Sequence, residues 1–136
     1  MKNPSFKTMS AAVTVGLTVS AVIIALMCVI PKRLVNRMYD ESMPYVENAL
    51  EKAISNRNSE AIPDIEKLIE IIDEHRDTLL LFYDHKDVAE LTWSAETAYD
   101  LSKTDDTAQL ITELCDITKV YRYLKHINDM SIFNIF

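Results

Sequence analysis

Glycine and cysteine are scarce in this chain of 136 residues, which contains one glycine and two cysteines. Tight β-hairpins need Gly or Asn at positive φ, so the composition argues against a β-rich body. A glycine-rich phosphate loop needs several glycines close together, whereas Gly16 lies alone inside an apolar run. Cys28 and Cys115 lie far apart in the sequence, and we expect no disulfide between them.

Acidic residues are absent before Asp40 and abundant after it. From Met38 to Phe136 the chain has nine basic and 21 acidic residues, a formal net charge of −12. A body of this charge is expected to repel nucleic acid and anionic lipid, so we predict no nucleic-acid binding. Its partners should be cations, basic surfaces or apolar faces. The basic residues that precede this body are Lys2, Lys7, Lys32, Arg33 and Arg37.

Charged residues of either sign are absent from Met9 to Ile30. As a helix this run would be about 33 Å long, enough to cross a hydrocarbon core of about 30 Å. It exceeds the apolar segment of a secretory signal, and its bulky end from Leu26 to Ile30 offers no small-x-small cleavage site. We therefore predict a short basic tail at residues 1–8 and an uncleaved transmembrane anchor at residues 9–31. A cleaved signal and a buried core helix are the alternatives.

The basic residues on the two sides of the apolar run nearly balance, so the positive-inside rule favours neither orientation strongly. A short N-terminal tail before a long apolar run is the usual signal-anchor arrangement, which leaves the C-terminal body outside the cytoplasm. We expect a single-pass protein of the cell membrane with an extracytoplasmic body. The alternative is an adaptor that faces the cytoplasm.

Apolar residues recur at helical spacing through residues 34–127, which predicts an all-α body, an acidic antiparallel bundle of about four helices. Pro44 is expected to bend or restart the first helix, and Asn58 or Ser59 to cap the second. Residues 128–136 form an apolar tail that should dock on the bundle or on a partner. The predicted core stripes are Val35, Met38, Val46, Ala49 and Ala53; Ala61, Ile65, Leu68, Ile72, His75, Leu79 and Phe82; Val88, Leu91, Ala95, Ala98 and Tyr99; and Leu110, Leu114, Ile117, Tyr121 and Leu124.

Two segments resemble an uncharacterised family of small bacterial membrane-anchored proteins, catalogued as domain of unknown function 4363. They are the aromatic-x-Asp-His segment at residues 82–85 and the tail from Leu124 to Phe136, with its His-Ile pair and its Asn-Ile-Phe end. The resemblance covers nearly the whole chain, and Asn128 departs from it where a proline is expected. It implies an anchored helical architecture and a bacterial origin. It implies no reaction, because the family has no assigned activity.

The best candidate for polar chemistry is the segment that holds Asp84, His85 and Asp87. Such a group could bind a metal ion or carry a proton. The plainer interpretation is a helix boundary, because Asp favours the start of a helix and His favours the end of the preceding one. No two ligands recur at i and i+4 with a third nearby, so we predict no metal site and no cofactor. His75 lies on an apolar stripe and should bond a backbone carbonyl.

Three aromatic residues are candidates for contact with a partner: Trp93, Phe133 and Phe136. Trp93 lies off the stripe of its helix, where it either extends the core, which we favour because Ala89 precedes it by one turn, or forms a contact patch. We predict a non-enzymatic interaction or accessory protein of the bacterial envelope that contacts the bilayer and another membrane or envelope protein. The alternatives are a metal-dependent sensor or enzyme centred on His85 and the cytoplasm-facing adaptor.

Overall fold

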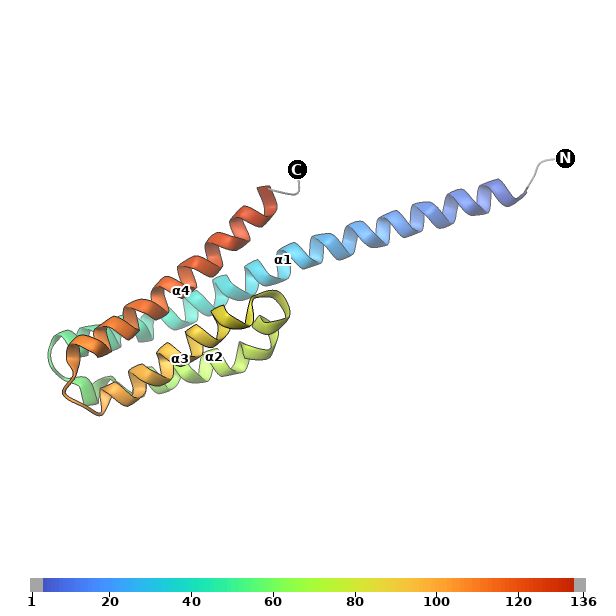
Figure 1. The fold of residues 1–136 in the computed structure, drawn as a ribbon. Helices are drawn as coiled ribbons and strands as arrows, with labels where there is room; N and C mark the ends of the chain where they lie inside the picture. The colour runs from blue at the N-terminus through green and yellow to red at the C-terminus, as the bar shows by residue number, and fades with distance from the viewer. Residues whose placement is uncertain (1–3, 134–136) are drawn as a thin grey trace.

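The computed structural model describes the backbone of residues 4–133 and the side chains of residues 11–128, and it is helical almost throughout (Figure 1). The elements are α1 (Pro4–Ile54), the short 3-10 helix η1 (Asn58–Ala61), α2 (Ile62–Phe82), α3 (His85–Ser102) and α4 (Thr107–Phe133). No strand occurs in residues 4–133. The prediction of an all-α chain with a long apolar N-terminal helix is confirmed.

Helix α1 joins the apolar run to the bundle without a break, which corrects two predicted boundaries (Figure 1). Pro31 and Pro44 both lie inside the helix, so Pro44 does not restart it and Pro31 does not divide the anchor from the body. Each proline removes one backbone hydrogen bond. Around Pro44 the residues Ser42, Met43 and Val46 are buried while Pro44 itself is exposed. Packing of the neighbouring turns therefore holds the helix together where local propensity would break it.

Three other boundaries also differ from prediction. Helix α1 already begins at Pro4, within the predicted tail of residues 1–8. Helix α2 begins at Ile62 with Ala61 at its N-cap position, so neither Asn58 nor Ser59 caps it. Helix α4 continues to Phe133, so the backbone of the predicted tail remains helical over most of its length. The second helix was misplaced because η1 precedes it and takes up the polar residues that resembled a cap.

The four helices pack in a ring in which α1 contacts α2 and α4, and α3 contacts the same two helices. The predicted core stripes are buried, with half-buried positions at His75, Phe82 and Tyr99. Ile54, expected beside the first stripe, is exposed at the end of α1. Burial of each large apolar side chain stabilises the fold by about 1.5–3 kcal/mol. The largest buried side chains are Tyr121, Met38, Ile65, Leu68, Ile72, Leu79, Leu91, Leu110, Leu114, Ile117 and Leu124.

One polar contact crosses the core between α1 and α4. The hydroxyls of Ser42 and Tyr121 lie 2.9 Å apart, and both side chains are fully buried. The Tyr121 ring packs edge-on against Tyr39 with centroids 6.1 Å apart, and Lys125 Nζ lies 4.0 Å from the centroid of the Tyr39 ring. Burial raises the pKa of Tyr121 to about 12. The contact satisfies two hydroxyls that water cannot reach, which fixes the register of α1 against α4.

We predict that Ser42→Ala and Tyr121→Phe each reduce the free energy of unfolding by about 1–3 kcal/mol, because each leaves one buried hydroxyl without a partner. The double variant should lose less than the sum of the two, since both polar groups are then gone. Thermal unfolding of the full chain measures the cycle. Tyr123→Phe is the matched control, because Tyr123 is exposed. Strict additivity of the two changes would contradict the hydrogen bond.

The same tyrosine makes stability depend on alkaline pH. The pKa of Tyr121 rises from an ordinary value of 10.0 to about 12 in the folded chain. Below pH 10 the group is neutral in both states, so it contributes no pH dependence. As the pH rises from about 10 to about 12 the unfolded chain ionises first, and the folded state loses stability. Tyr121→Phe should remove this contribution in unfolding curves measured across that range.

Candidate functional site

The Asp84 segment forms the start of α3 and not a ligand cluster. Asp84 is the N-cap residue, and its Oδ1 accepts a hydrogen bond from the backbone N–H of Lys86 at 2.7 Å. Asp87 lies in the first turn, where its charge complements the helix dipole, and His85 is exposed. Within residues 11–128 no group of three or more His, Cys, Asp or Glu is placed to hold a metal ion. The helix-boundary interpretation of Asp84 therefore fits the geometry.

His75, the other histidine of the predicted cluster, has a structural partner. Its Nδ1 lies 3.0 Å from the carbonyl oxygen of Ile71, one turn earlier in α2, so the ring N–H donates to the backbone. The expectation of a half-buried histidine bonded to a carbonyl is confirmed. The ring is thereby held against its own helix. No described acid shares a hydrogen bond with it.

Asparagine separates the two interpretations of Asp84, because Asn caps a helix about as well as Asp but is a much poorer metal ligand. We predict that Asp84→Ala reduces the free energy of unfolding by about 0.5–2 kcal/mol, and that Asp84→Asn changes it little. Thermal unfolding with and without a chelator measures both variants. A metal site would instead show a loss of stability on chelation that Asp84→Asn abolishes.

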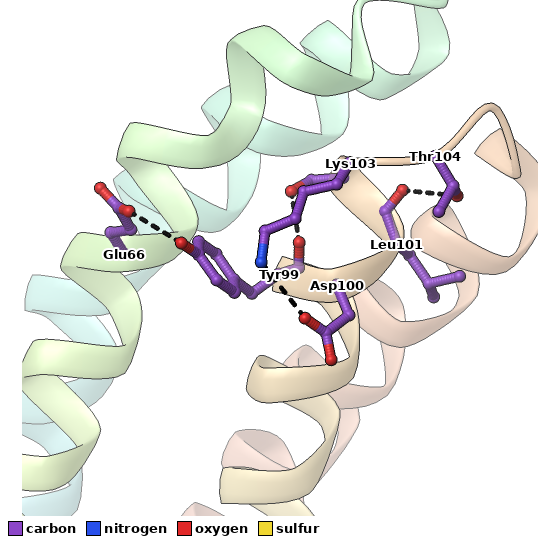
Figure 2. Close-up of polar contacts among 7 residues, drawn as sticks. Glu66, Tyr99, Asp100, Leu101, Lys103 and Thr104 are labelled. Atoms are coloured by element: carbon purple, nitrogen blue, oxygen red, sulfur yellow. Dashed lines mark hydrogen bonds and ion pairs between the residues drawn. The ribbon is translucent and has the colours of Figure 1, made fainter.

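A second polar group lies at the other end of α3, where the chain turns toward α4 (Figure 2). The Tyr99 hydroxyl donates to Glu66 Oε1 on α2 at 3.2 Å, and Lys103 Nζ lies 3.7 Å from the centroid of the Tyr99 ring. Lys103 also pairs with Asp100 at 3.3 Å. These side chains are partnered with one another at the surface. They stabilise the end of α3, and exposed pairs of this kind contribute at most about 1 kcal/mol each.

The two polar turns at this end contact each other. Asn58 Nδ2 donates to the carbonyl oxygen of Thr104 at 3.0 Å, and Thr107 Oγ1 donates to Asn58 Oδ1 at 3.1 Å. Asn58 is buried, so its amide closes the turn after α1 onto the turn before α4. Asn56 precedes it with φ of 56°, a left-handed conformation that Asn tolerates. Here, too, the polar groups hold the turns of the fold.

The opposite end of the bundle is closed by Tyr83, which was not among the predicted site residues. Asn128 Nδ2 donates to Tyr83 Oη at 2.7 Å, and the hydroxyl in turn lies 3.2 Å from the carbonyl oxygen of Pro31. Asn128 Oδ1 lies 2.9 Å from the same hydroxyl, whose single proton serves one acceptor at a time. Burial raises the pKa of Tyr83, and the bond to Asn128 opposes that rise. Tyr83 thus ties the end of the apolar run to α4.

Among residues 11–128, Trp93 is the most exposed aromatic side chain, at 73% of its full accessible area. Core extension, the favoured prediction, is wrong. Leu91 and Ala95 face the core from the same helix, and a residue two positions after Leu91 points about 200° away. The register of the stripe therefore excludes Trp93 from the core. Its alternative role, a contact patch, stays open.

An open groove of about 550 Å³ lies beside Trp93 between α3 and α4. Small side chains line part of it, among them Ala89, Ser94 and Thr97. Charged side chains line it as well, with Lys86 and Glu90 from α3 and Glu113 from α4. Exposed aromatic area next to a hollow with a polar rim is typical of a protein contact surface. Phe133 and Phe136, the other two candidates, fall outside the described side chains.

The apolar part of α1 stands clear of this bundle (Figure 1). Side chains from Ala11 to Ile30 are exposed, except for half-buried Cys28, and Leu17 reaches 68% exposure. Among the described residues α1 is the one helix long and apolar enough to cross a membrane. A comparison of the chain with family models, curated proteins and solved structures finds no match.

Proposed function

We propose that this chain is a single-pass membrane protein whose helical body is an interaction or accessory module for another membrane or envelope protein of a bacterium. The observation that carries the proposal is the exposure of apolar side chains all around α1 from Ala11 to Val29. A helix that is apolar on every side needs an apolar solvent. No other described helix covers it, so the bilayer is the partner that its surface fits.

The interaction role is supported by Trp93 and the groove beside it. Tryptophan is enriched among the residues that dominate binding energy at protein interfaces, and the small side chains that line the groove allow close approach of a partner. The polar side chains at the Asp84 segment and at the turns serve as caps and turn contacts. We therefore propose a binding role and no enzymatic one, in preference to the metal-dependent sensor or enzyme. We also propose no cofactor and no nucleic-acid partner.

We place the body on the extracytoplasmic side, as the order of a basic start, an apolar helix and a long polar body favours. The basic residues on both sides of the apolar run are nearly balanced, so they oppose this only weakly. A cytoplasmic adaptor is the second candidate, and the compartment of the partner distinguishes the two. We also propose, from the resemblance at residues 82–85 and 124–136, that the chain belongs to domain of unknown function 4363.

The anchor is tested by substituting arginine for apolar residues inside and outside the predicted span and measuring membrane retention. Arginine in the middle of a membrane helix costs about 2.5–3.5 kcal/mol on insertion scales. We predict that Val19→Arg with Val22→Arg reduces the carbonate-resistant fraction of the full chain in membranes, whereas the unmodified chain stays in that fraction at its full mass. The matched control is Ile54→Arg with Leu81→Arg, because both residues are apolar and exposed but lie outside the run. Equal loss in both pairs, or a shortened soluble product, would refute the anchor.

The contact surface is tested by a photo-reactive amino acid at position 93 in the full chain in its native membrane. We predict one defined cross-linked product with a membrane or envelope protein, and none from position 81, where Leu81 is 75% exposed but lies outside the groove. Trp93→Ala should abolish co-purification of that protein and change the free energy of unfolding by less than about 0.5 kcal/mol, as expected for a surface position. Matching products from both positions would contradict a specific surface.

A further inference from the structure

We propose that the anchor end of the bundle binds anionic lipid headgroups through a basic belt, defined here as Lys32, Arg33 and Arg37 of α1 with Arg122 and Lys125 of α4. The inference rests on the proposed function in one respect, since it requires that the apolar run of α1 spans a bilayer. It adds a second membrane contact, which is polar and comes from a helix far along the chain.

The charge of the two helices changes sign along the bundle. On α1, residues 32–39 hold three basic residues and no acid, whereas residues 40–51 hold four acids and no basic residue. Along α4 and the turn before it the order is reversed: residues 105–116 hold four acids and no basic residue, whereas residues 117–128 hold three basic residues, His126 and no acid. The two helices contact each other, so the two basic segments and the two acidic segments are sorted in space as well.

Contacts between the helices place both basic segments at the level where the apolar run ends. Tyr83 bonds to Pro31 on α1 and to Asn128 on α4. Further into the bundle, Lys125 lies over the ring of Tyr39, and Ser42 meets Tyr121. Rising residue numbers on α1 therefore match falling numbers on α4. The basic segment of α4 lies beside that of α1.

The belt is close enough to a membrane surface to feel its charge. Arg37 is six residues beyond Pro31, and Arg122 is six residues before Asn128, which corresponds to about 9 Å along each helix. Electrostatic attraction in physiological salt decays over a length of about 8 Å, so Lys32 and Arg33 feel most of the surface charge and Arg37 and Arg122 feel a reduced part of it. Arg33 and Arg122 are exposed at this level. Arg37 is shared with Glu41 at 2.8 Å, so part of its charge is already balanced.

Acidic residues at the same end do not cancel the belt. Within six residues of the level set by Tyr83, the remaining charges are Lys86 on one side and Asp77, Asp84, Asp87 and Asp129 on the other. With the belt included, this end has six basic and four acidic residues, a formal charge of +2. The rest of the chain from Lys32 onward has six basic and 17 acidic residues, a formal charge of −11. The net charge of −12 for the body predicted repulsion from anionic lipid. The charge is unevenly distributed, however, and the end of the bundle nearest the anchor is the positive one.

A bilayer fits this end better than an acidic protein does. The belt lies on α1 and α4 at the base of the apolar part of α1, so the surface in front of it is the one the anchor enters. The backbone of α4 also continues past Asn128 to Phe133, on the anchor side of the belt (Figure 1). In sequence this section is apolar at Met130, Ile132 and Phe133. Basic residues next to an apolar segment are the usual composition of a helix end at an anionic membrane surface.

The test uses the full chain in lipid nanodiscs of phosphatidylcholine with phosphatidylglycerol. Electron paramagnetic resonance of spin-labelled lipids measures the association of each lipid with the protein. We expect a preference for phosphatidylglycerol that weakens as salt is added. In Arg33→Gln with Arg122→Gln the preference should fall by up to about fivefold for each cation removed. Both side chains are exposed, so the bundle should keep its melting temperature.

The matched control is Arg57→Gln with Lys103→Gln, which removes the same charge from exposed positions at the far end of the bundle. It should keep the preference of the unmodified chain. Absence of a preference in the unmodified chain, or an equal loss in both pairs, would overturn the belt, even if the first pair weakened binding to an acidic protein. The anchor is tested separately from the belt. If carbonate extracts the chain from membranes, the proposed function is refuted, whatever the lipid preference.

Discussion

The fold depends on one helix that passes from an apolar environment into a protein core. From Ala11 to Ile30 the side chains of α1 are uncharged and, except for half-buried Cys28, exposed, and from Pro31 the same helix buries one face against α2 and α4. The hydrogen-bonded backbone continues through both prolines, so the two environments are joined without a linker. The remaining helices pack around the C-terminal part of α1, from Pro31 to Ile54. Their stability and their placement therefore both depend on the continuity of this helix.

Polar side chains close the two ends of the bundle in different ways. At the far end Asn58 joins the turn after α1 to the turn before α4, and Tyr99 with Lys103 holds the end of α3. At the anchor end Tyr83 reaches across to Pro31 and Asn128. The side-chain amide of Asn128 donates to the Tyr83 hydroxyl through Nδ2. A proline there would have no side-chain donor for Tyr83.

The elements of this fold that repeat along the chain could be predicted from the sequence. Core stripes follow helical spacing, so positions such as Leu68 and Leu114 are identified by periodicity alone. The capping role of Asp84 also follows from its type and place. Trp93 was misjudged because Ala89, one turn earlier, was taken as a sign of core extension, although the spacing from Leu91 already directs Trp93 away from the core. That error concerned the one candidate contact residue whose side chain the structure describes.

Features that depend on how two distant segments meet could not be predicted. Tyr83 and Asn128 are separated by 45 positions, and Ser42 and Tyr121 by 79. Periodicity states which face of a helix is buried but not which residue lies opposite. Local sequence also does not report how tertiary packing acts on a helix. Pro44 tends to end a helix, but packing at Met43 and Val46 overcomes that tendency. The sorting of charge between the two ends likewise appears only when α4 is placed beside α1.

The unbroken helix also gives the protein the mechanics of a lever. From Pro31 to Ile54 the bundle part of α1 extends about 36 Å, and Tyr83 clamps its base against α4. Because the helix is continuous between span and body, a tilt of the span is transmitted to the bundle. Membrane helices tilt by about 20° on average, and a tilt of that size would carry the far end of the bundle about 12 Å sideways. The thickness of the surrounding bilayer would then set where the groove beside Trp93 points.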